Sequence, residues 1–291
     1  MTKNILITGA NGQLGSEIEA LSSNYSSDVK FFFTDKDDLD ISNKSSIESF
    51  CTNNNIHAII NCAAYTAVDK AEEDAGKADL FNHVGVKLLA KVSKDLDISF
   101  VHISTDYIFD GKNYKPYLED DVSSPESIYG KTKLLGEEAL LKINPKNSII
   151  IRTSWVYSSF GNNFVKTMLR LGKDRDELGV IFDQVGTPTY AKDLAQAILN
   201  ILPQLDNINV EIFHYSNEGV CSWYDFAKTI FELSDISCTV KPIETKEYPT
   251  LATRPHYSLL NKSKIKEHFG LEIPYWKDSL KSCLKTLKEN T

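Results

Sequence analysis

The sequence predicts an α/β fold, a doubly wound parallel sheet of the Rossmann type with a smaller, mostly helical C-terminal lobe. In the first half of the chain, short apolar runs alternate with helical patterns. The runs are apolar at consecutive positions, which is typical of strands buried on both faces of a parallel sheet. A glycine-rich turn follows the first run, where a βα unit needs a tight turn.

The elements of the first half follow in regular order. β-branched and aromatic clusters predict strands at residues 5–7, 31–33, 57–61, 100–104 and 149–151. Apolar residues at helical spacing predict helices at residues 14–21, 47–50, 75–96 and 129–141. A polar, proline-containing loop at residues 111–125 interrupts the alternation. Such alternation implies helices on both faces of one sheet.

The pattern becomes less regular after Trp155. Further helices are predicted at residues 164–171, 194–202, 223–233, 262–269 and 276–287, with irregular, proline-containing segments between them. We therefore expect a dinucleotide-binding Rossmann domain at residues 1–157. Residues 158–291 would form mainly the substrate-binding lobe, with segments that return to the Rossmann sheet.

Charge and composition exclude several classes of protein. The net charge of −8 and a pI near 5.3 argue against nucleic-acid binding through overall charge. No run of eighteen apolar residues is present, so no membrane association is expected. The apolar stretch near the start is too short for a signal peptide. The five cysteines are scattered and never spaced C-x-x-C, as expected of reduced thiols in a cytoplasmic protein.

The first βα turn carries three glycines with a predicted role in cofactor binding. Gly9 permits the tight turn, Gly12 lets the backbone approach a pyrophosphate, and Gly15 lets helix and sheet pack closely. The spacing is G-x-x-G-x-x-G, and a purely structural turn is the alternative. Asp35 ends the second strand, where an acid binds the adenosine ribose. Lys36 beside it leaves the choice between NADPH and NADH open.

Other strand ends face the same crevice in a doubly wound sheet. Small or short side chains there would let a dinucleotide pass close to the backbone, although tight packing alone also explains the two alanines. The residues at these ends are Asp40, Ile41, Ala63, Ala64, Tyr65 and Thr66.

Tyr129 and Lys133 form the predicted catalytic pair. Residues four apart share one helix face, so both can point into one crevice. Reduction of a carbonyl needs a proton at its oxygen, and a neighbouring cation lowers the pKa of a phenol from its usual value near ~10. Thr105 at a strand end can hydrogen-bond the substrate oxygen. An exposed helix with an unrelated Tyr and Lys is the alternative.

Motifs along nearly the whole chain resemble the extended short-chain dehydrogenases, and within them the dTDP-4-dehydrorhamnose reductase family. The Trp155 and Gly-Asn-Asn-Phe stretches narrow the match to that subfamily. The matching segments are residues 9–15, 61–72, 104–111, 129–137, 152–157, 161–164, 183–189 and 254–259.

The resemblance implies reduction of the 4-keto group of dTDP-4-dehydro-6-deoxy-L-mannose to dTDP-L-rhamnose with NADPH or NADH, by a homodimer. It implies that Tyr129 donates the proton, Lys133 assists it and Thr105 tunes its acidity. The implied cofactor contacts are Gly12, Gln13, Leu14, Asp35, Asp40, Ile41, Ala64, Tyr65, Thr66 and Ile103. The implied contacts to the sugar nucleotide are Thr105, Asp106 and Trp155.

Two further candidate sites are a diphosphate contact at Arg254 and a metal site near Glu17. Arg254 lies in a proline-flanked loop, and a guanidinium suits the oxygens of a diphosphate. The resemblance also implies that some relatives bind a divalent ion at a dimer interface through acidic side chains. Glu17 matches one such ligand, but Lys192 stands where an acid is expected. We therefore predict no metal.

Two other functions remain open at this point. The first is a non-catalytic regulatory subunit, because the β subunit of methionine adenosyltransferase is similar in sequence to this family. Intact Thr105, Tyr129, Lys133 and Trp155 favour the enzyme. The second is a related nucleotide-sugar reductase or epimerase with another product.

Overall fold

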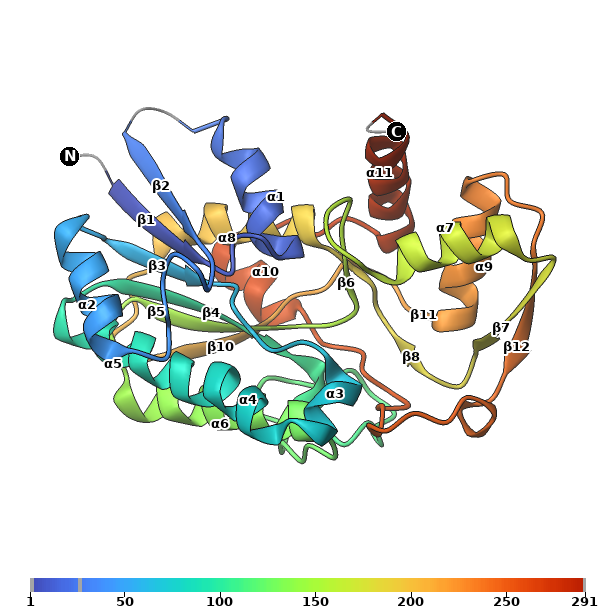
Figure 1. Ribbon diagram of the computed structural model, residues 1–291, viewed down its shortest axis with the longest axis horizontal. Coiled ribbons are helices and arrows are strands. Elements are labelled where there is room, and N and C mark those ends of the chain that lie inside the picture. Colours follow the sequence, from blue (N-terminus) through green and yellow to red (C-terminus); the bar gives the residue numbers. More distant parts are fainter. Residues whose placement is uncertain (1–2, 26–27, 290–291) are drawn as a thin grey trace.

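A six-stranded parallel sheet forms the centre of the computed structural model, which describes residues 3–25 and 28–289 (Figure 1). The strand order is β10-β5-β4-β3-β1-β2, so the winding direction reverses between β1 and β3. All neighbours in the sheet are parallel, which confirms the predicted fold class. The strands are β1 (Lys3–Thr8), β2 (Val29–Thr34), β3 (Ala58–Asn61), β4 (Ser99–Thr105), β5 (Ser148–Thr153) and β10 (Glu211–His214).

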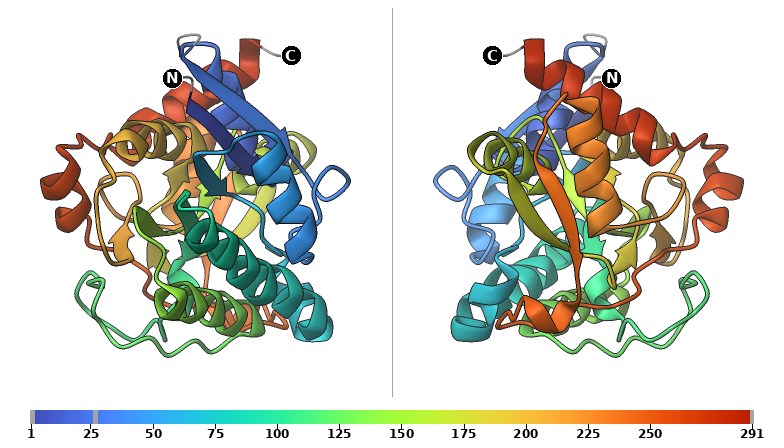
Figure 2. Two further views of the ribbon diagram at one scale, coloured as in Figure 1. Left: turned by 90° about the vertical axis from the view of Figure 1, so that its left-hand side faces the viewer. Right: turned by 90° about the vertical axis from the view of Figure 1, so that its right-hand side faces the viewer.

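Helices cover both faces of this sheet (Figure 1). On one face pack α1 (Gln13–Ser22), α8 (Ala191–Ile201) and α10 (Ser263–Phe269); on the other pack α2 (Lys44–Asn53), α5 (Val86–Asp95) and α6 (Ile128–Ile143). Helices α5 and α6 lie side by side, as Figure 2 shows. Strand β1 sends Ile5 and Ile7 to the first face and Leu6 to the second, which explains its continuous apolar run. In the part of the chain described, no helix is both long and apolar enough to span a membrane.

A smaller lobe packs beyond the carboxyl ends of the sheet strands (Figure 1). Its core is aromatic and aliphatic, with Phe226 and Ile230 of α9 against Trp276 and Leu280 of α11. Pairs of short strands accompany its helices. The sequence did not predict these strands, because each has only two to five residues. The elements are β6 (Val156–Tyr157), α7 (Phe164–Asp174), β7 (Glu177–Ile181), β8 (Val185–Gly186), β9 (Thr189–Tyr190), β11 (Cys221–Ser222), α9 (Trp223–Leu233), β12 (Thr239–Ile243) and α11 (Trp276–Glu289).

The chain passes between the sheet and the lobe several times. Strand β10 pairs with β5, and α8 packs on α1, although both elements follow residue 157. The division of the chain into residues 1–157 and 158–291 stays a prediction.

The helix predicted at residues 75–96 is divided into three parts. Helix α4 (Ala75–Asp79) continues into a π-helical segment, η1 (Leu80–Gly85), and then into α5. A π-helical segment turns side chains away from the usual helical positions, which apolar periodicity does not detect. One short helix, α3 (Val68–Glu73), precedes them and was not predicted.

A buried ion pair joins α6 to the sheet. The Arg152 guanidinium on β5 donates to Glu137 on α6, with Nη2 and Oε2 2.8 Å apart, and both side chains are almost fully buried. The Ser104 hydroxyl donates to the same carboxylate, and Arg152 Nη1 donates to the Glu119 carbonyl at 3.0 Å. Each charge is therefore paired and hydrogen-bonded, as burial requires.

Arg152→Met should lower the free energy of unfolding by about 3–5 kcal/mol, because it leaves the Glu137 carboxylate buried without its partner. Urea denaturation followed by far-UV circular dichroism measures the change. The double variant Arg152→Met/Glu137→Leu should recover most of the loss. As a control, Lys241→Ala removes the exposed pair with Glu177 and should leave the urea midpoint nearly unchanged. Equal losses in Arg152→Met and the double variant would contradict this account.

Candidate active site

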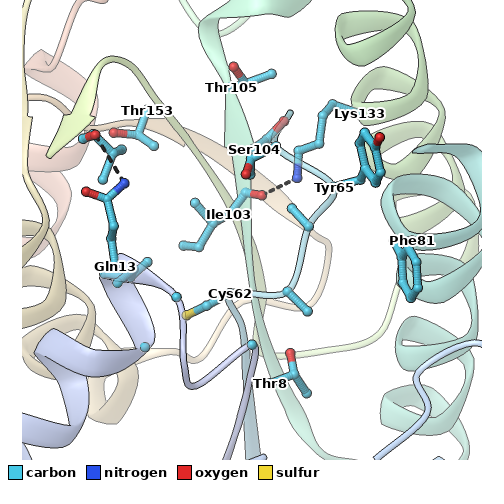
Figure 3. Close-up of a pocket in the computed structure, with 18 of the residues that line it drawn as sticks. Thr8, Gln13, Cys62, Tyr65, Phe81, Ile103, Ser104, Thr105, Lys133 and Thr153 are labelled. Carbon is cyan, nitrogen blue, oxygen red and sulfur yellow. Dashed lines mark hydrogen bonds between the residues drawn. The ribbon is translucent and has the colours of Figure 1, made fainter. Parts of the chain in front are cut away.

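A cavity of about 710 Å³ lies beyond the carboxyl ends of β1, β3, β4 and β5, between the sheet and the lobe (Figure 3). This is the crevice at the reversal of the sheet, where doubly wound folds bind ligands. The predicted site residues that line it are Gly9, Gly12, Gln13, Leu14, Gly15, Asp35, Asp40, Ile41, Ala63, Ala64, Tyr65, Thr66, Ile103, Thr105, Asp106, Tyr129, Lys133 and Trp155. Arg254 is the predicted site residue that is absent from this lining.

The glycine loop approaches its neighbours too closely for side chains. Gly9 has a φ of +67°, and a Cβ there would lie 2.6 Å from the backbone nitrogen of Ala63. A Cβ on Gly15 would lie 2.6 Å from Cα of Ala10. Gly12 precedes α1 with no side-chain cap, so the first N–H groups of the helix are left for another acceptor. The loop therefore offers an anion site at a helix N-terminus.

Asp35 and Lys36 both line the cavity at the end of β2. The Asp35 carboxylate accepts hydrogen bonds from the backbone N–H of Asn11 at 3.2 Å and of Lys36 at 2.7 Å. The carboxylate is thereby fixed next to the glycine loop. The neighbouring ammonium keeps a positive charge in the same part of the cavity.

Asn82 holds the cavity loop that follows β3. It lies in η1, is fully buried, accepts from the Tyr65 N–H at 2.8 Å and donates to the Tyr65 carbonyl at 3.1 Å. The same amide donates to the Thr132 hydroxyl on α6 at 3.2 Å. Sequence reasoning missed Asn82 because residues 75–96 were assigned to one regular helix.

Helix α6 places Tyr129 and Lys133 in the cavity wall. The Ser127 side chain caps the helix by accepting from the Gly130 N–H at 3.1 Å. A Cβ on Gly130 would lie 2.2 Å from the Tyr107 carbonyl, so glycine is needed where α6 meets the segment after β4. The Lys133 ammonium is nearly fully buried and donates to the Ile103 carbonyl at 2.6 Å (Figure 3).

The electrostatics of this pair differ from the sequence prediction. Burial raises the pKa of the Tyr129 phenol to about 12, and the Thr105 hydroxyl only partly opposes that shift. Burial lowers the pKa of the Lys133 ammonium to about 8, against the opposing charge of Glu137. Desolvation is the largest cause of the Tyr129 shift, and the Lys133 ammonium is not among its causes, so the predicted acidification of the phenol is not seen. Tyr129 keeps its proton at neutral pH, as a proton donor must.

Asp106 is a buried carboxyl group beside Thr105. The Thr105 hydroxyl donates to its Oδ1 at 3.0 Å. Burial raises the pKa of Asp106 to about 7, so it is partly protonated at neutral pH. It can therefore act as a donor as well as an acceptor in the cavity.

Trp155 forms a rigid apolar part of the cavity wall. Its φ is +49°, a conformation that side chains other than glycine adopt at a cost. Its ring stacks on Trp223 with centroids 3.6 Å apart and planes 12° from parallel. On Gly186, a Cβ would lie 3.0 Å from Cε2 of Trp155. The indole is therefore clamped in place.

Arg254 is held by a carboxylate of the sheet domain. Its guanidinium donates to both oxygens of Asp69 on α3, at 3.1 and 2.6 Å. This bidentate pair lowers the pKa of Asp69. The proposed contact of Arg254 to a diphosphate stays a prediction.

Other cavity residues had no predicted site role. Phe81 comes from the π-helical segment, Thr153 and Ser154 from the end of β5, and residues 161–163 from the lobe. Thr153, Ser154 and residues 161–163 lie in segments that match the family motifs, whereas Phe81 lies outside them.

No group of three or more His, Cys, Asp or Glu side chains within residues 3–25 and 28–289 is placed to hold a metal ion. Glu17 is buried, accepts from the Ser158 hydroxyl at 2.6 Å, and has its pKa raised by burial. The expectation of no metal stays a prediction.

Comparisons with known proteins agree with this geometry. The model of the RmlD substrate binding domain family matches residues 2–289. A dTDP-4-dehydrorhamnose reductase of Aggregatibacter actinomycetemcomitans is 42% identical over 288 residues, covering 96% of this chain and 97% of that protein. A crystal structure of such a reductase from Clostridium acetobutylicum has a TM-score of 0.92 and 45% identity, covering 98% and 99% of the two chains. That from Bacillus anthracis, in complex with NADP, has a TM-score of 0.92 and 37% identity, covering 98% and 100%.

Trp223→Leu should release the Trp155 ring, because leucine fills space without stacking. We expect the circular dichroism signal of two coupled indoles to disappear, and the free energy of unfolding to fall by about 1–3 kcal/mol. Trp276→Phe, in α11, is the control and should leave that signal in place, because Trp276 is not part of the stack. Retention of the coupled signal in Trp223→Leu would contradict the clamp.

Proposed function

The chain belongs to the RmlD substrate binding domain family, and from this premise we propose that it is an NAD(P)H-dependent dTDP-4-dehydrorhamnose reductase. It reduces the 4-keto group of dTDP-4-dehydro-6-deoxy-L-mannose to give dTDP-L-rhamnose. One observation carries the proposal. Tyr129 and Lys133 of α6, Thr105 of β4 and the glycine loop after β1 all line one cavity.

The residues present fit a dinucleotide. A Cβ on Gly9 would collide with the backbone of the neighbouring strand end. Gly12 has no side chain in front of the uncapped N-terminus of α1, so a pyrophosphate can approach the backbone closely there. The Asp35 carboxylate can accept from a ribose hydroxyl. The residues proposed to hold the cofactor are Gly9, Gly12, Gln13, Leu14, Gly15, Asp35, Asp40, Ile41, Ala63, Ala64, Tyr65, Thr66, Ile103, Tyr129 and Lys133.

The reduced nicotinamide supplies hydride to the carbonyl carbon. Tyr129 supplies the proton, because its phenol lines the cavity in hydrogen-bonding reach of Thr105 and is protonated at neutral pH. Thr105 orients the substrate oxygen, and Lys133 provides positive charge beside the phenol below its own pKa of about 8. Asp106 and the fixed Trp155 ring contact the sugar nucleotide, the carboxyl group with hydroxyls and the indole with the apolar face of the deoxysugar.

Both reduced cofactors are proposed substrates. The Asp35 carboxylate suits the free ribose hydroxyl of NADH, whereas Lys36 beside it can neutralise the 2′-phosphate of NADPH. A relative in the family has been solved with NADP. Titration of protein fluorescence with each cofactor measures the preference.

The location and assembly of the enzyme are also proposals. Five free thiols, at Cys51, Cys62, Cys221, Cys238 and Cys283, fit a reducing, cytoplasmic compartment. A homodimer is proposed from the family resemblance, and sedimentation velocity tests it. The reading as a regulatory subunit is not favoured, because the full set of catalytic side chains lines the cavity.

Tyr129→Phe should lower kcat by roughly 10²-fold or more while leaving cofactor affinity close to that of the wild type, because only the proton donor is lost. The loss of nicotinamide absorbance with dTDP-4-dehydro-6-deoxy-L-mannose measures kcat, and product analysis identifies the sugar. Lys131→Ala is the control. Lys131 lies two residues after Tyr129 on α6 and is exposed, so this variant should retain full turnover. Near-normal kcat in Tyr129→Phe would remove Tyr129 from the mechanism, and no wild-type turnover would remove the reductase assignment.

A further inference from the structure

A row of buried polar side chains lies behind the catalytic lysine. Thr8 ends β1, Asn61 ends β3 and His102 lies in β4; Thr8 is paired with Asn61, and Asn61 with His102, in the register of the sheet. The three side chains are at most 1% exposed. They lie on the face of the sheet that α6 covers, and the row ends at Lys133.

The distances along the row describe one connected set of hydrogen bonds. The Thr8 hydroxyl donates to Asn61 Oδ1 at 2.6 Å, and Asn61 Nδ2 lies 3.0 Å from His102 Nδ1. His102 Nε2 lies 3.4 Å from Lys133 Nζ. The first two contacts are between neighbouring strands, so the sheet itself holds the imidazole in place.

The chemistry of the four groups restricts the state of the histidine. An ammonium only donates hydrogen bonds, so beside charged Lys133 the ring nitrogen Nε2 must accept. In a neutral imidazole the other nitrogen, Nδ1, then carries the hydrogen and donates it. An Nδ1–H needs an acceptor, whereas the structure places Asn61 Nδ2 toward Nδ1 and Oδ1 toward Thr8. The assignment therefore requires the Asn61 amide to be rotated by half a turn, so that Oδ1 accepts from Nδ1 and the NH₂ group donates to the Thr8 hydroxyl.

We propose that His102 is a positioning residue for Lys133: a permanently neutral, Nδ1-protonated imidazole whose Nε2 accepts one hydrogen bond from the ammonium. The proposal rests on the reductase function proposed above. The Ile103 carbonyl takes a second N–H of Lys133 at 2.6 Å. Two of the three donors are thereby fixed toward β4, and the third is left for the cavity, which Tyr129 also lines and where a cofactor ribose would bind.

Groups on every element packed against the ammonium bear on its charge. Cys62 at the end of β3 is a neutral thiol, because burial raises its pKa to about 12. Glu137 on α6 favours the ammonium but is already paired with Arg152. Tyr129, one turn earlier on α6, keeps its proton. Burial lowers the pKa of His102 well below its usual value, so the ring stays an acceptor throughout the physiological pH range.

The sign of the effect follows from these contacts. Burial already lowers the pKa of Lys133 to about 8. A hydrogen bond to the charged form opposes that lowering. Loss of the Nε2 acceptor should therefore lower the pKa of Lys133 further and leave it uncharged at a lower pH.

Asparagine and glutamine at position 102 separate positioning from packing. The side-chain oxygen of Gln reaches the place of Nε2, whereas that of Asn reaches only the place of Nδ1. In His102→Asn the alkaline limb of kcat/KM should move down by about one pH unit, and kcat/KM at pH 8 should fall about fivefold. His102→Gln should stay within about threefold of the wild type. His57→Asn is the control. His57 is exposed and lies outside the row of buried side chains, so this variant should leave the pH profile of kcat/KM unchanged.

A purely structural role predicts a different outcome. It would lower the thermal midpoint in both variants without moving the alkaline limb. An unchanged limb in His102→Asn, or equal limbs in His102→Asn and His102→Gln, overturns the proposal.

A second measurement does not depend on turnover or on either variant being folded. In protein labelled with ¹⁵N-histidine, the His102 ring should be neutral, Nδ1-protonated and constant from pH 5.5 to 8.5. Buried His214, whose Nδ1 faces the Tyr117 carbonyl, should give a second ring of this kind. The His102 signal is the one absent from spectra of His102→Asn or, if that variant does not fold, the one assigned through bonds in the wild type. A His102 ring that titrates near its ordinary pKa of ~6.5, or that is protonated at Nε2, overturns the proposal. If the wild type has this ring but no turnover, the reductase function fails and the hydrogen bond stands.

Discussion

The position of α6 depends on the buried ion pair between Glu137 and Arg152, and the chemistry of the cavity depends on α6. Glu137 lies one turn beyond Lys133, and two turns beyond Tyr129, on the same helix. Fixing the carboxylate against β4 and β5 therefore fixes where the phenol and ammonium meet the cavity. A pair so fully desolvated has value mainly through its geometry, because its attraction roughly offsets the cost of burying two charges.

Desolvation determines the charge of the groups in the cavity. It raises the pKa of Tyr129 and Asp106 and lowers that of Lys133. The phenol thereby stays protonated at neutral pH, and the pKa of the Asp106 carboxyl is brought close to 7. Hydrogen bonds from β4 offset part of this cost, the Ile103 carbonyl accepting from Lys133 and the Ser104 hydroxyl donating to Glu137.

Close approach is a second constraint on the site. At Gly9, Gly130 and Gly186 a side chain would meet backbone or an aromatic ring. After β5 the backbone has a positive φ at Trp155, and the Trp223 ring stacks on the Trp155 ring and fixes its orientation. Two of these contacts, Gly9 with Ala63 and Trp155 with Trp223, join residues more than fifty positions apart in the chain. They make one rigid wall from the sheet and the lobe.

The doubly wound sheet, the glycine loop and the helical spacing of Tyr129 and Lys133 could be predicted from residue order, because they depend on local periodicity and on turns that residue types dictate. The other features arise from contacts that form only when the chain folds. Four such contacts join residues far apart in the chain. They are the hydrogen bonds of Asn82 to Tyr65, the stack of Trp223 on Trp155, the bidentate pairing of Arg254 with Asp69, and the row from Thr8 to His102. The pKa of Tyr129 likewise depends on burial, which no spacing of residues reveals, because desolvation is a property of the packed molecule.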